Sequence, residues 1–137
     1  MHFSESLKKN KDFINVYNNS RSRADRFMVL YVMKNSSGVN RIGVSVSKKV
    51  GNSVVRHRLK RLVKEAYRLH ETSFEKGYDL VVIMRKSACD QEFRPIEHSL
   101  IRLAMLHKVF KEEYEENNDL SDQGLQEIHI TYDGASL

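Results

Sequence analysis

Residues 43–61, GVSVSKKVGNSVVRHRLKR, constrain the fold more than any other stretch of the chain. An alternating strand pattern, a Lys-Lys-x-Gly turn and a basic helical pattern follow one another there without a break. Between Arg41 and Arg68, nine Lys or Arg side chains stand against one acid, Glu65. Because so many like charges repel one another unless an anion neutralises them, we expect a phosphate-rich partner, a nucleic acid.

The charge of the chain is divided between two segments. The net charge is +5, but all 23 Lys and Arg lie in residues 1–111 with 10 of the 18 acids, which gives this part +13. Residues 112–137 hold the other 8 acids and no Lys or Arg, which gives −8. We therefore predict one basic domain over residues 1–116 and an acidic, disordered tail over residues 117–137.

Cysteine content and hydropathy indicate the compartment. The one cysteine, Cys89, permits neither an intramolecular disulfide nor a cysteine cluster for zinc, which is typical of a reducing cytosol. The longest apolar run, residues 27–33, is too short to span a bilayer, and the N-terminus has no signal-peptide pattern. We expect a soluble, cytoplasmic protein without a membrane partner.

The first part of the chain predicts a helix followed by strands. Asn10 is a suitable cap for a helix in which Phe13 and Tyr17, four residues apart, share one face. Residues 27–33 predict a strand with apolar side chains on both faces, with one more short strand around residues 21–25.

A second strand follows a turn at residues 36–38. Apolar side chains alternate over residues 42–46, which favours an antiparallel hairpin with strand 27–33 and one face in the core.

The rest of the chain predicts helix, strand and helix. A helix spans about residues 52–71, with a predicted core stripe of Val55, Leu59, Leu62, Ala66 and Leu69. Gly77 follows this helix as its stop signal, and residues 78–84 are apolar enough for a central strand with both faces covered. Residues 92–115 form the last helix.

Catalytic and metal-binding patterns are missing from the basic segment. Glu65 follows Arg61 by four residues, so a surface ion pair explains it better than a metal ligand. The six His have no metal-ligand spacing, and Cys89 has no adjacent base to make it a nucleophile. We therefore predict no catalytic and no metal-binding side chain in this protein.

Two features are suited to RNA. Lys48 and Lys49 precede Gly51 and a helix N-terminus, where backbone N–H groups can approach a phosphate, although the nucleotide P-loop order is absent. Four aromatic side chains form either core or a base-stacking platform with a basic rim of Lys9, Lys11 and Arg26: Phe13, Tyr17, Phe27 and Tyr31.

Four segments of the chain form a recognisable set: LKKNKDF at residues 7–13, DRF…LY within residues 25–31, the block at residues 43–61, and YDLVVIMRK at residues 78–86. In these segments the chain closely resembles the protein subunit of bacterial ribonuclease P. The similarity covers roughly residues 5–111, and the acidic tail is not part of the family pattern.

The resemblance implies an α+β fold of the ribosomal-protein S5 domain 2-like type. This fold is a two-layer α/β sandwich, in which helices pack a mostly antiparallel sheet, with a left-handed βαβ crossover through the basic helix. The implied function is that of a ribonuclease P subunit, which binds the catalytic RNA in a 1:1 complex together with the 5′ leader of precursor tRNA. The holoenzyme is an endoribonuclease that removes the leader to generate the mature tRNA 5′ end, with chemistry from the RNA subunit and Mg²⁺.

The resemblance also implies site residues. The signature Arg-Asn-Arg falls on Arg56, His57 and Arg58, where His57 replaces the usual Asn and loses the paired geometry of an amide. The leader cleft is implied at Phe13, Tyr17 and Tyr31, with Lys9 and Arg26 at its rim. The RNA-subunit surface comprises Lys48, Lys49, Asn52, Arg56, His57, Arg58, Lys60, Arg61, Lys64 and Arg68.

Alternatives remain at this point. A structural ribosomal-type RNA-binding protein or RNA chaperone, without a role in cleavage, would also be small and basic. A DNA-binding module would place the helix in a major groove, but its side chains suit backbone charge better than base edges. The acidic tail either competes with RNA for Lys48, Lys49 and the Arg56–Arg61 face or stays solvated without a role.

Overall fold

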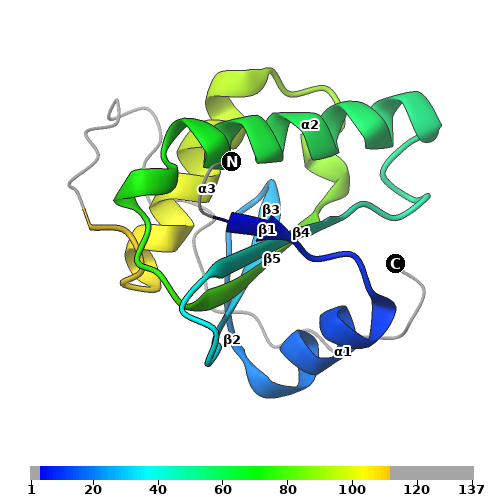
Figure 1. The fold of residues 1–137 in the computed structure, drawn as a ribbon. Coiled ribbons are helices and arrows are strands. Elements are labelled where there is room, and N and C mark those ends of the chain that lie inside the picture. The colour runs from blue at the N-terminus through cyan, green and yellow to red at the C-terminus, as the bar shows by residue number, and fades with distance from the viewer. Residues whose placement is uncertain (1–3, 112–137) are drawn as a thin grey trace.

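A five-stranded sheet forms the centre of the computed structural model, which describes residues 4–111 (Figure 1). The strands are β1 (Ser4–Ser6), β2 (Arg21–Ala24), β3 (Met28–Lys34), β4 (Asn40–Ser45) and β5 (Tyr78–Met84), in the spatial order β1-β4-β5-β3-β2. The middle position of β5 confirms the prediction from its unbroken apolar run, because a central strand has both faces covered.

Three α-helices of the described region cover the two faces of the sheet unequally (Figure 1). α2 (Ser53–Leu69) and α3 (Phe93–Leu106) pack on one face, and the shorter α1 (Asn10–Asn19) packs on the other. Two short 3₁₀ turns, η1 (Glu71–Ser73) and η2 (Lys86–Ala88), follow α2 and β5. The α+β class is confirmed, and α1 adds a partial third layer to the two layers formed by the sheet and the α2–α3 pair.

The sheet is mixed, and the predicted hairpin between residues 27–33 and 42–46 is wrong. β3 pairs antiparallel with β5, while β4 pairs parallel with β5 and with β1. β5 therefore lies between the two strands of the expected hairpin. The turn at Gly38 connects β3 to β4 across the beginning of β5 and does not form a tight hairpin. At this crossing the backbone N–H of Asn35 donates to the Gly77 carbonyl at 2.7 Å.

β4, α2 and β5 form a βαβ unit through the basic helix. The parallel pairing of β4 with β5 confirms this crossover, and its left-handed sense stays a prediction. Sequence patterns do not reveal β1, because three residues are too few to display a period. Its pairing with β4 is extended by the Leu7 N–H, which donates to the Ile42 carbonyl at 2.8 Å.

The larger core lies between the sheet and the α2–α3 pair. Four side chains of α2 reach it with 0% exposure: Leu59, Val63, Ala66 and Tyr67. The predicted stripe is therefore wrong at Leu69, which is 51% exposed, because Tyr67 turns inward to contact the ring of Phe74 at 4.8 Å between centroids. The inward side of α2 is apolar throughout, so its cations are left for the outward side.

Two helix ends differ from prediction. α3 ends at Leu106, not near residue 115, because Lys108 adopts a φ of 61° and the helix closes in a Schellman motif with two hydrogen bonds. These bonds run from Val109 N–H to the Ala104 carbonyl and from Lys108 N–H to the Met105 carbonyl. At α1, Lys9 occupies the cap position without a side-chain hydrogen bond, and Asn10 is already helical. The predicted tail, residues 117–137, lies outside the described residues.

Candidate nucleic-acid interface

The turn between β4 and α2 is fixed by its own backbone. Val50 is buried, and its N–H donates to the Ser47 carbonyl at 3.0 Å, which leaves the neighbouring Lys48 and Lys49 exposed. Asn52 caps α2, because its side-chain oxygen accepts from the Val55 N–H at 3.0 Å. The sequence places two cations beside the positive end of a helix, as predicted for a phosphate-binding turn.

The outward side of α2 carries most of the cations of this helix. His57, Lys60, Arg61 and Lys64 are exposed there. Arg68 is exposed as well and forms an ion pair with Glu65, which agrees with a structural role for that carboxylate; the partner foreseen from the sequence was Arg61. The hydrogen bond from Arg68 is the first cause of the lowered pKa of the Glu65 carboxyl.

Arg56 and Arg58 differ from the other cations of α2, since both are half-buried and donate to backbone carbonyls. Arg56 Nη1 donates to the Gly51 carbonyl at 2.9 Å and so ties the helix to the preceding turn. Arg58 Nη2 donates to the Gln91 carbonyl in the loop that leads into α3. Helical periodicity cannot reveal these contacts, because both acceptors are backbone atoms and one is 33 residues away.

The three aromatic residues of the predicted leader cleft come together on the α1 face of the sheet. The Phe13 and Tyr17 rings lie 6.4 Å apart between centroids, and Tyr17 meets Tyr31 of β3 edge-on at 5.0 Å. The rings are 7%, 8% and 3% exposed, in the order Phe13, Tyr17 and Tyr31, and belong to a second apolar cluster with Val29 and Val81. Burial raises the pKa of the Tyr31 phenol.

Gly43 makes the position of Phe13 possible. A Cβ atom on Gly43 would lie 2.6 Å from Cζ of the Phe13 ring, so the ring rests directly on the β4 backbone. The cluster therefore has the geometry of core packing, and stacking of leader bases on it stays a prediction.

The predicted rim residues do not lie together. Lys9 is exposed immediately before α1. The guanidinium of Arg26, in the turn between β2 and β3, lies 4.8 Å from the ring centroid of Phe27, whose side chain belongs to the larger core on the opposite face. Lys9 is thus close in sequence to the aromatic cluster, whereas Arg26 is attached to the other side of the sheet.

A hollow of about 340 Å³ joins the two predicted binding regions. It lies between the start of α1, the end of β4 and the outward side of α2. Its cations are Lys8, Lys60 and Lys64, and Phe13 forms part of its wall. The hollow is completed by Leu7, Asn10, Val44, Ser45 and Val46. The sequence gives no indication of Lys8 here, because β1 is needed to bring residues 7–10 beside β4.

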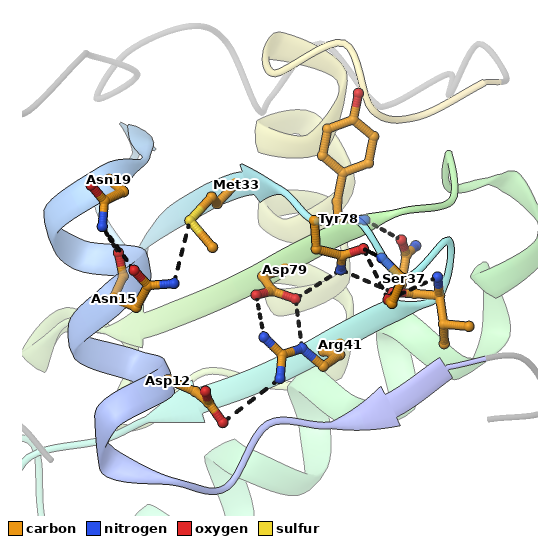
Figure 2. A network of polar contacts seen from close by, with 11 residues as sticks. Asp12, Asn15, Asn19, Met33, Ser37, Arg41, Tyr78 and Asp79 are labelled. Atoms are coloured by element: carbon orange, nitrogen blue, oxygen red, sulfur yellow. Dashed lines mark hydrogen bonds and ion pairs between the residues drawn. The ribbon is translucent and has the colours of Figure 1, made fainter.

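A buried carboxylate on β5 is connected to α1 through Arg41 (Figure 2). Asp79 on β5 is 0% exposed and accepts from Arg41 Nε at 2.8 Å and from Arg41 Nη2 at 2.6 Å, and Asn35 donates to it at 2.9 Å. Arg41 Nη1 also lies 3.7 Å from Asp12 Oδ2 on α1. The hydrogen bond to Asp79 is the main cause of the raised pKa of Arg41.

Two histidines of residues 4–111 occur in structural contacts. His107 is buried, with its Nε2 2.8 Å from the Leu30 carbonyl, and His70 Nε2 lies 2.9 Å from Glu97 Oε2. No three His, Cys, Asp or Glu of the described region lie close enough together to hold a metal ion. Within the same region, no helix is long and apolar enough to cross a membrane.

Comparison with known proteins identifies the fold. Residues 1–108 match the family model for ribonuclease P. The ribonuclease P protein component of Lachnoclostridium phytofermentans is 45% identical over 115 residues, which cover 84% of this chain and 99% of that protein. The chain belongs to the ribonuclease P protein family. The component from Clostridium botulinum strain Langeland is 52% identical over 98 residues, 71% of this chain and 88% of its own length.

Solved structures of ribonuclease P proteins share the same fold. The Staphylococcus aureus RNase P protein aligns with a TM-score of 0.71 at 36% identity, and the match covers 78% of this chain and 98% of that chain. The Thermotoga maritima RNase P protein aligns with a TM-score of 0.68 at 30% identity over 73% of this chain and 94% of its own.

Membership of the ribonuclease P protein family defines the role of the chain. It is the protein subunit of an endoribonuclease holoenzyme that acts in tRNA 5′ processing, and ribonuclease P RNA is its partner. The comparisons do not favour a ribosomal-type structural protein or an RNA chaperone. The individual contact residues stay predictions, since the structure contains the protein alone.

Proposed function

We propose that the outward side of α2 and the turn before it bind the ribonuclease P RNA, with one protein per RNA. The proposal rests above all on the two-sidedness of α2, whose inward residues Leu59, Val63 and Ala66 are 0% exposed while Lys60, Arg61 and Lys64 point away from the core into solvent. Such a face neutralises phosphates without disturbing the packing beneath it. The proposed contacts are Lys48, Lys49, Asn52, Arg56, His57, Arg58, Lys60, Arg61, Lys64 and Arg68.

Among these contacts, we assign different roles to the half-buried and the exposed cations. Arg56 and Arg58 each use a hydrogen bond to hold the N-terminal part of α2 in place, and their remaining N–H groups face the RNA. Lys60, Arg61 and Lys64 are exposed and act as phosphate contacts. His57 accepts or donates one hydrogen bond on the same surface.

We further propose that the single-stranded 5′ leader of precursor tRNA is held at the α1 side of the hollow. Lys8, Lys60 and Lys64 approach the hollow from two elements, and Phe13 provides an apolar wall beside them. A nucleotide chain needs both features, because its phosphates pair with cations while its bases stack on aromatic or apolar surfaces. Phe13, Tyr17 and Tyr31 form the proposed platform, with Lys9 as the cation beside it; Arg26, predicted at the same rim, lies against Phe27 on the other side of the sheet.

The proposal leaves cleavage to the RNA subunit, with Mg²⁺ supplying the metal-activated water. The protein contributes attraction for phosphates and a defined path for the leader, so that precursor tRNA binds more tightly than mature tRNA. We place this activity in the cytoplasm, where tRNA precursors are processed.

Reconstitution tests both halves of the proposal. The full chain is combined with a bacterial ribonuclease P RNA at low Mg²⁺, and cleavage of precursor tRNA is measured with and without the protein. We expect cleavage to require the RNA and to be stimulated by the protein, and affinity to be higher for precursor than for mature tRNA. Cleavage by the protein alone, or equal affinity for both tRNAs, would contradict the assigned roles.

A paired substitution tests the α2 surface. Lys60→Ala with Lys64→Ala should lower the slope of log affinity for the RNA subunit against log salt by roughly 0.7 to 0.9 for each phosphate that is no longer neutralised. The matched control is Lys34→Ala with Lys76→Ala, two exposed lysines at the end of β3 and just before β5, which should leave the slope unchanged. An equal change in both pairs would show only a loss of general charge.

A further inference from the structure

The outward side of α2 also carries apolar surface that phosphate binding does not explain. A groove of about 520 Å³ lies along its middle and C-terminal turns, lined by Arg58, Arg61, Leu62, Lys64, Glu65 and Arg68. Leu69 is seven residues after Leu62, on the same side of the helix, and is 51% exposed. Cations around an exposed apolar strip are suited to a peptide with acidic and apolar side chains.

The chain itself contains such a peptide. Residues 112–137 hold 8 acids and no Lys or Arg, together with apolar side chains at Leu120, Leu125, Ile128, Ile130 and Tyr132. This segment lies beyond the family match, which ends at residue 108. The rest of the chain carries +13, so the segment and the domain attract one another.

The described chain ends near the C-terminal end of α2. The Lys111 N–H donates to the Ser73 carbonyl at 2.7 Å, and the Phe110 ring meets Phe74 edge-on at 5.3 Å. Ser73 is four residues beyond Leu69, the last residue of α2. The segment after residue 111 therefore starts at the end of α2 where Leu69 and Arg68 lie.

Length is sufficient for docking without strain. α2 has 17 residues and is about 26 Å long at 1.5 Å per residue. Residues 112–137 span up to about 86 Å when extended at about 3.3 Å per residue. A tethered segment also acts at an effective concentration of about a millimolar, so weak affinity for the groove is enough.

We propose that residues 112–137 dock in the groove of α2 through their acids and apolar side chains, and compete there with RNA. Because Arg58, Arg61, Lys64 and Arg68 line the groove and belong to the proposed RNA surface, the two partners exclude one another. The docked segment lowers affinity most for nonspecific RNA, which binds weakly. The ribonuclease P RNA makes many phosphate contacts and therefore displaces the docked segment. The competition rests on the proposed function of α2; the docking does not.

Full-length variants test the docking directly. In the neutral-tail variant all eight acids become amides: Glu112, Glu113, Glu115, Glu116, Asp119, Asp122, Glu127 and Asp133. Methyl NMR signals of Leu62 and Leu69 should differ between this variant and the wild type at about 0.1 M salt. They should converge at about 0.5 M, where the Debye length is about 4 Å. Coincident signals at low salt would overturn the proposal, as would a shift that grows with protein concentration, since that shows docking between two copies.

Binding of an unrelated single-stranded RNA tests the competition. At about 0.1 M salt the neutral-tail variant should bind about three- to tenfold more tightly than the wild type, and at about 0.5 M the difference should fall below about twofold. Leu69→Ser, on the groove side, should give part of the same gain in RNA affinity. Combined with the neutral tail, it should give no gain beyond that of the neutral tail alone. A gain from the neutral tail with no effect of Leu69→Ser would show diffuse charge attraction and overturn docking in the groove. If α2 does not bind RNA, the methyl signals still differ while RNA affinity is the same in all variants, so this outcome refutes the proposed function alone.

Discussion

The face of the sheet beneath α2 and α3 and the face beneath α1 bury different kinds of side chain. Under α2 and α3 the core is apolar and large, with Leu59, Phe74, Leu100 and Leu103 all at 1% exposure or less. Under α1 the apolar cluster is smaller, and the fully buried Asp79 carboxylate lies on the same face, bound to Arg41. Both faces contribute to the proposed RNA-binding surface, but they support it by different means.

The comparison shows how a small domain combines exposed cations on one side with a buried aromatic cluster on the other. α2 gains its stability from its inward side, so the residues on its outward side are free to be cations, because surface substitutions cost little. α1 has ten residues and buries only Phe13, Val16 and Tyr17, so its position depends on a few contacts and on the ion pairs around Arg41. Substitutions beneath α1 should therefore change stability and leader binding together, whereas those on α2 should separate them.

The largest effect is expected at the buried ion pair. Arg41→Ala leaves the Asp79 carboxylate buried with Asn35 as its remaining side-chain donor, and removal of one partner from a buried pair costs about 3 kcal/mol or more. We place Arg41 at the low end of that range because its side chain is 30% exposed. Urea unfolding should show the loss, and Asp12→Asn, which removes only the outer partner at 3.7 Å, should change stability by under about 1 kcal/mol. Equal losses in the two variants would show that Asp79 tolerates isolation.

A methyl group beneath Phe13 sharpens the comparison on the α1 face. In Gly43→Ala the new Cβ would lie 2.6 Å from Phe13 Cζ, so the ring must move, at a cost of about 1 to 3 kcal/mol in stability. Affinity for precursor tRNA should fall while affinity for mature tRNA is spared, since the loss of a stacked base costs about 1 to 3 kcal/mol. Fluorescence titration of both tRNAs measures the ratio, and unfolding measures stability.

The control for Gly43→Ala is the double variant with Phe13→Leu, which reduces the clash but removes the ring. It should recover stability and not leader selectivity. If Gly43→Ala is destabilised but keeps full preference for precursor tRNA, Phe13 belongs to the core alone and the proposed platform is wrong.

These same residues show what the sequence could predict. Period and composition placed β3, β5 and the beginning of α2 correctly, because side-chain alternation and helical spacing are local properties. The antiparallel neighbour of β3 depends on β5 inserting between β3 and β4, and the inward turn of Tyr67 depends on its contact with Phe74. Both are properties of the tertiary structure, not of a local period. For this reason the hairpin was mispredicted, although each of its strands is present.

The candidate site divides in the same way. The exposed cations of α2 follow from helical spacing, but the bonds of Arg56 and Arg58 to carbonyls, the position of Lys8 and the clamp on Asp79 do not. Each depends on backbone atoms or on residues distant in sequence. The resemblance to the family supplied the aromatic cluster as a site, while periodicity left it as either core or platform.

Arg58 and Arg61 provide a matched pair on α2 with a smaller expected effect. Arg58→Ala removes the hydrogen bond to the Gln91 carbonyl, at a cost of about 0.5 to 1.5 kcal/mol in stability, and also removes an RNA contact. Arg61→Ala, at an exposed position, should change stability by less than about 0.5 kcal/mol and affect RNA affinity alone. Thermal unfolding of the free protein and titration with the RNA subunit compare the two. Equal stability of the two variants would mean that the hydrogen bond to Gln91 contributes little to the folded state.

The smallest effect concerns the phenol of Tyr67, which connects α2 to the edge of the sheet. Its hydroxyl lies 2.6 Å from Ser4 Oγ and accepts from Asn40 Nδ2 at 3.2 Å, and burial raises the pKa of Tyr67 above its ordinary value of about 10. Because the folded state favours the neutral phenol, this contribution to stability is complete below about pH 10. It declines as pH rises further, since the unfolded chain then releases a proton that the folded chain retains. Urea unfolding between about pH 8 and pH 11 should therefore show that the free energy of unfolding declines more steeply for the wild type than for Tyr67→Phe. At pH 8 the variant should be less stable than the wild type by about 1 kcal/mol, because it lacks the hydrogen bonds of the hydroxyl. Parallel pH profiles would show that the Tyr67 hydroxyl meets water in the folded protein.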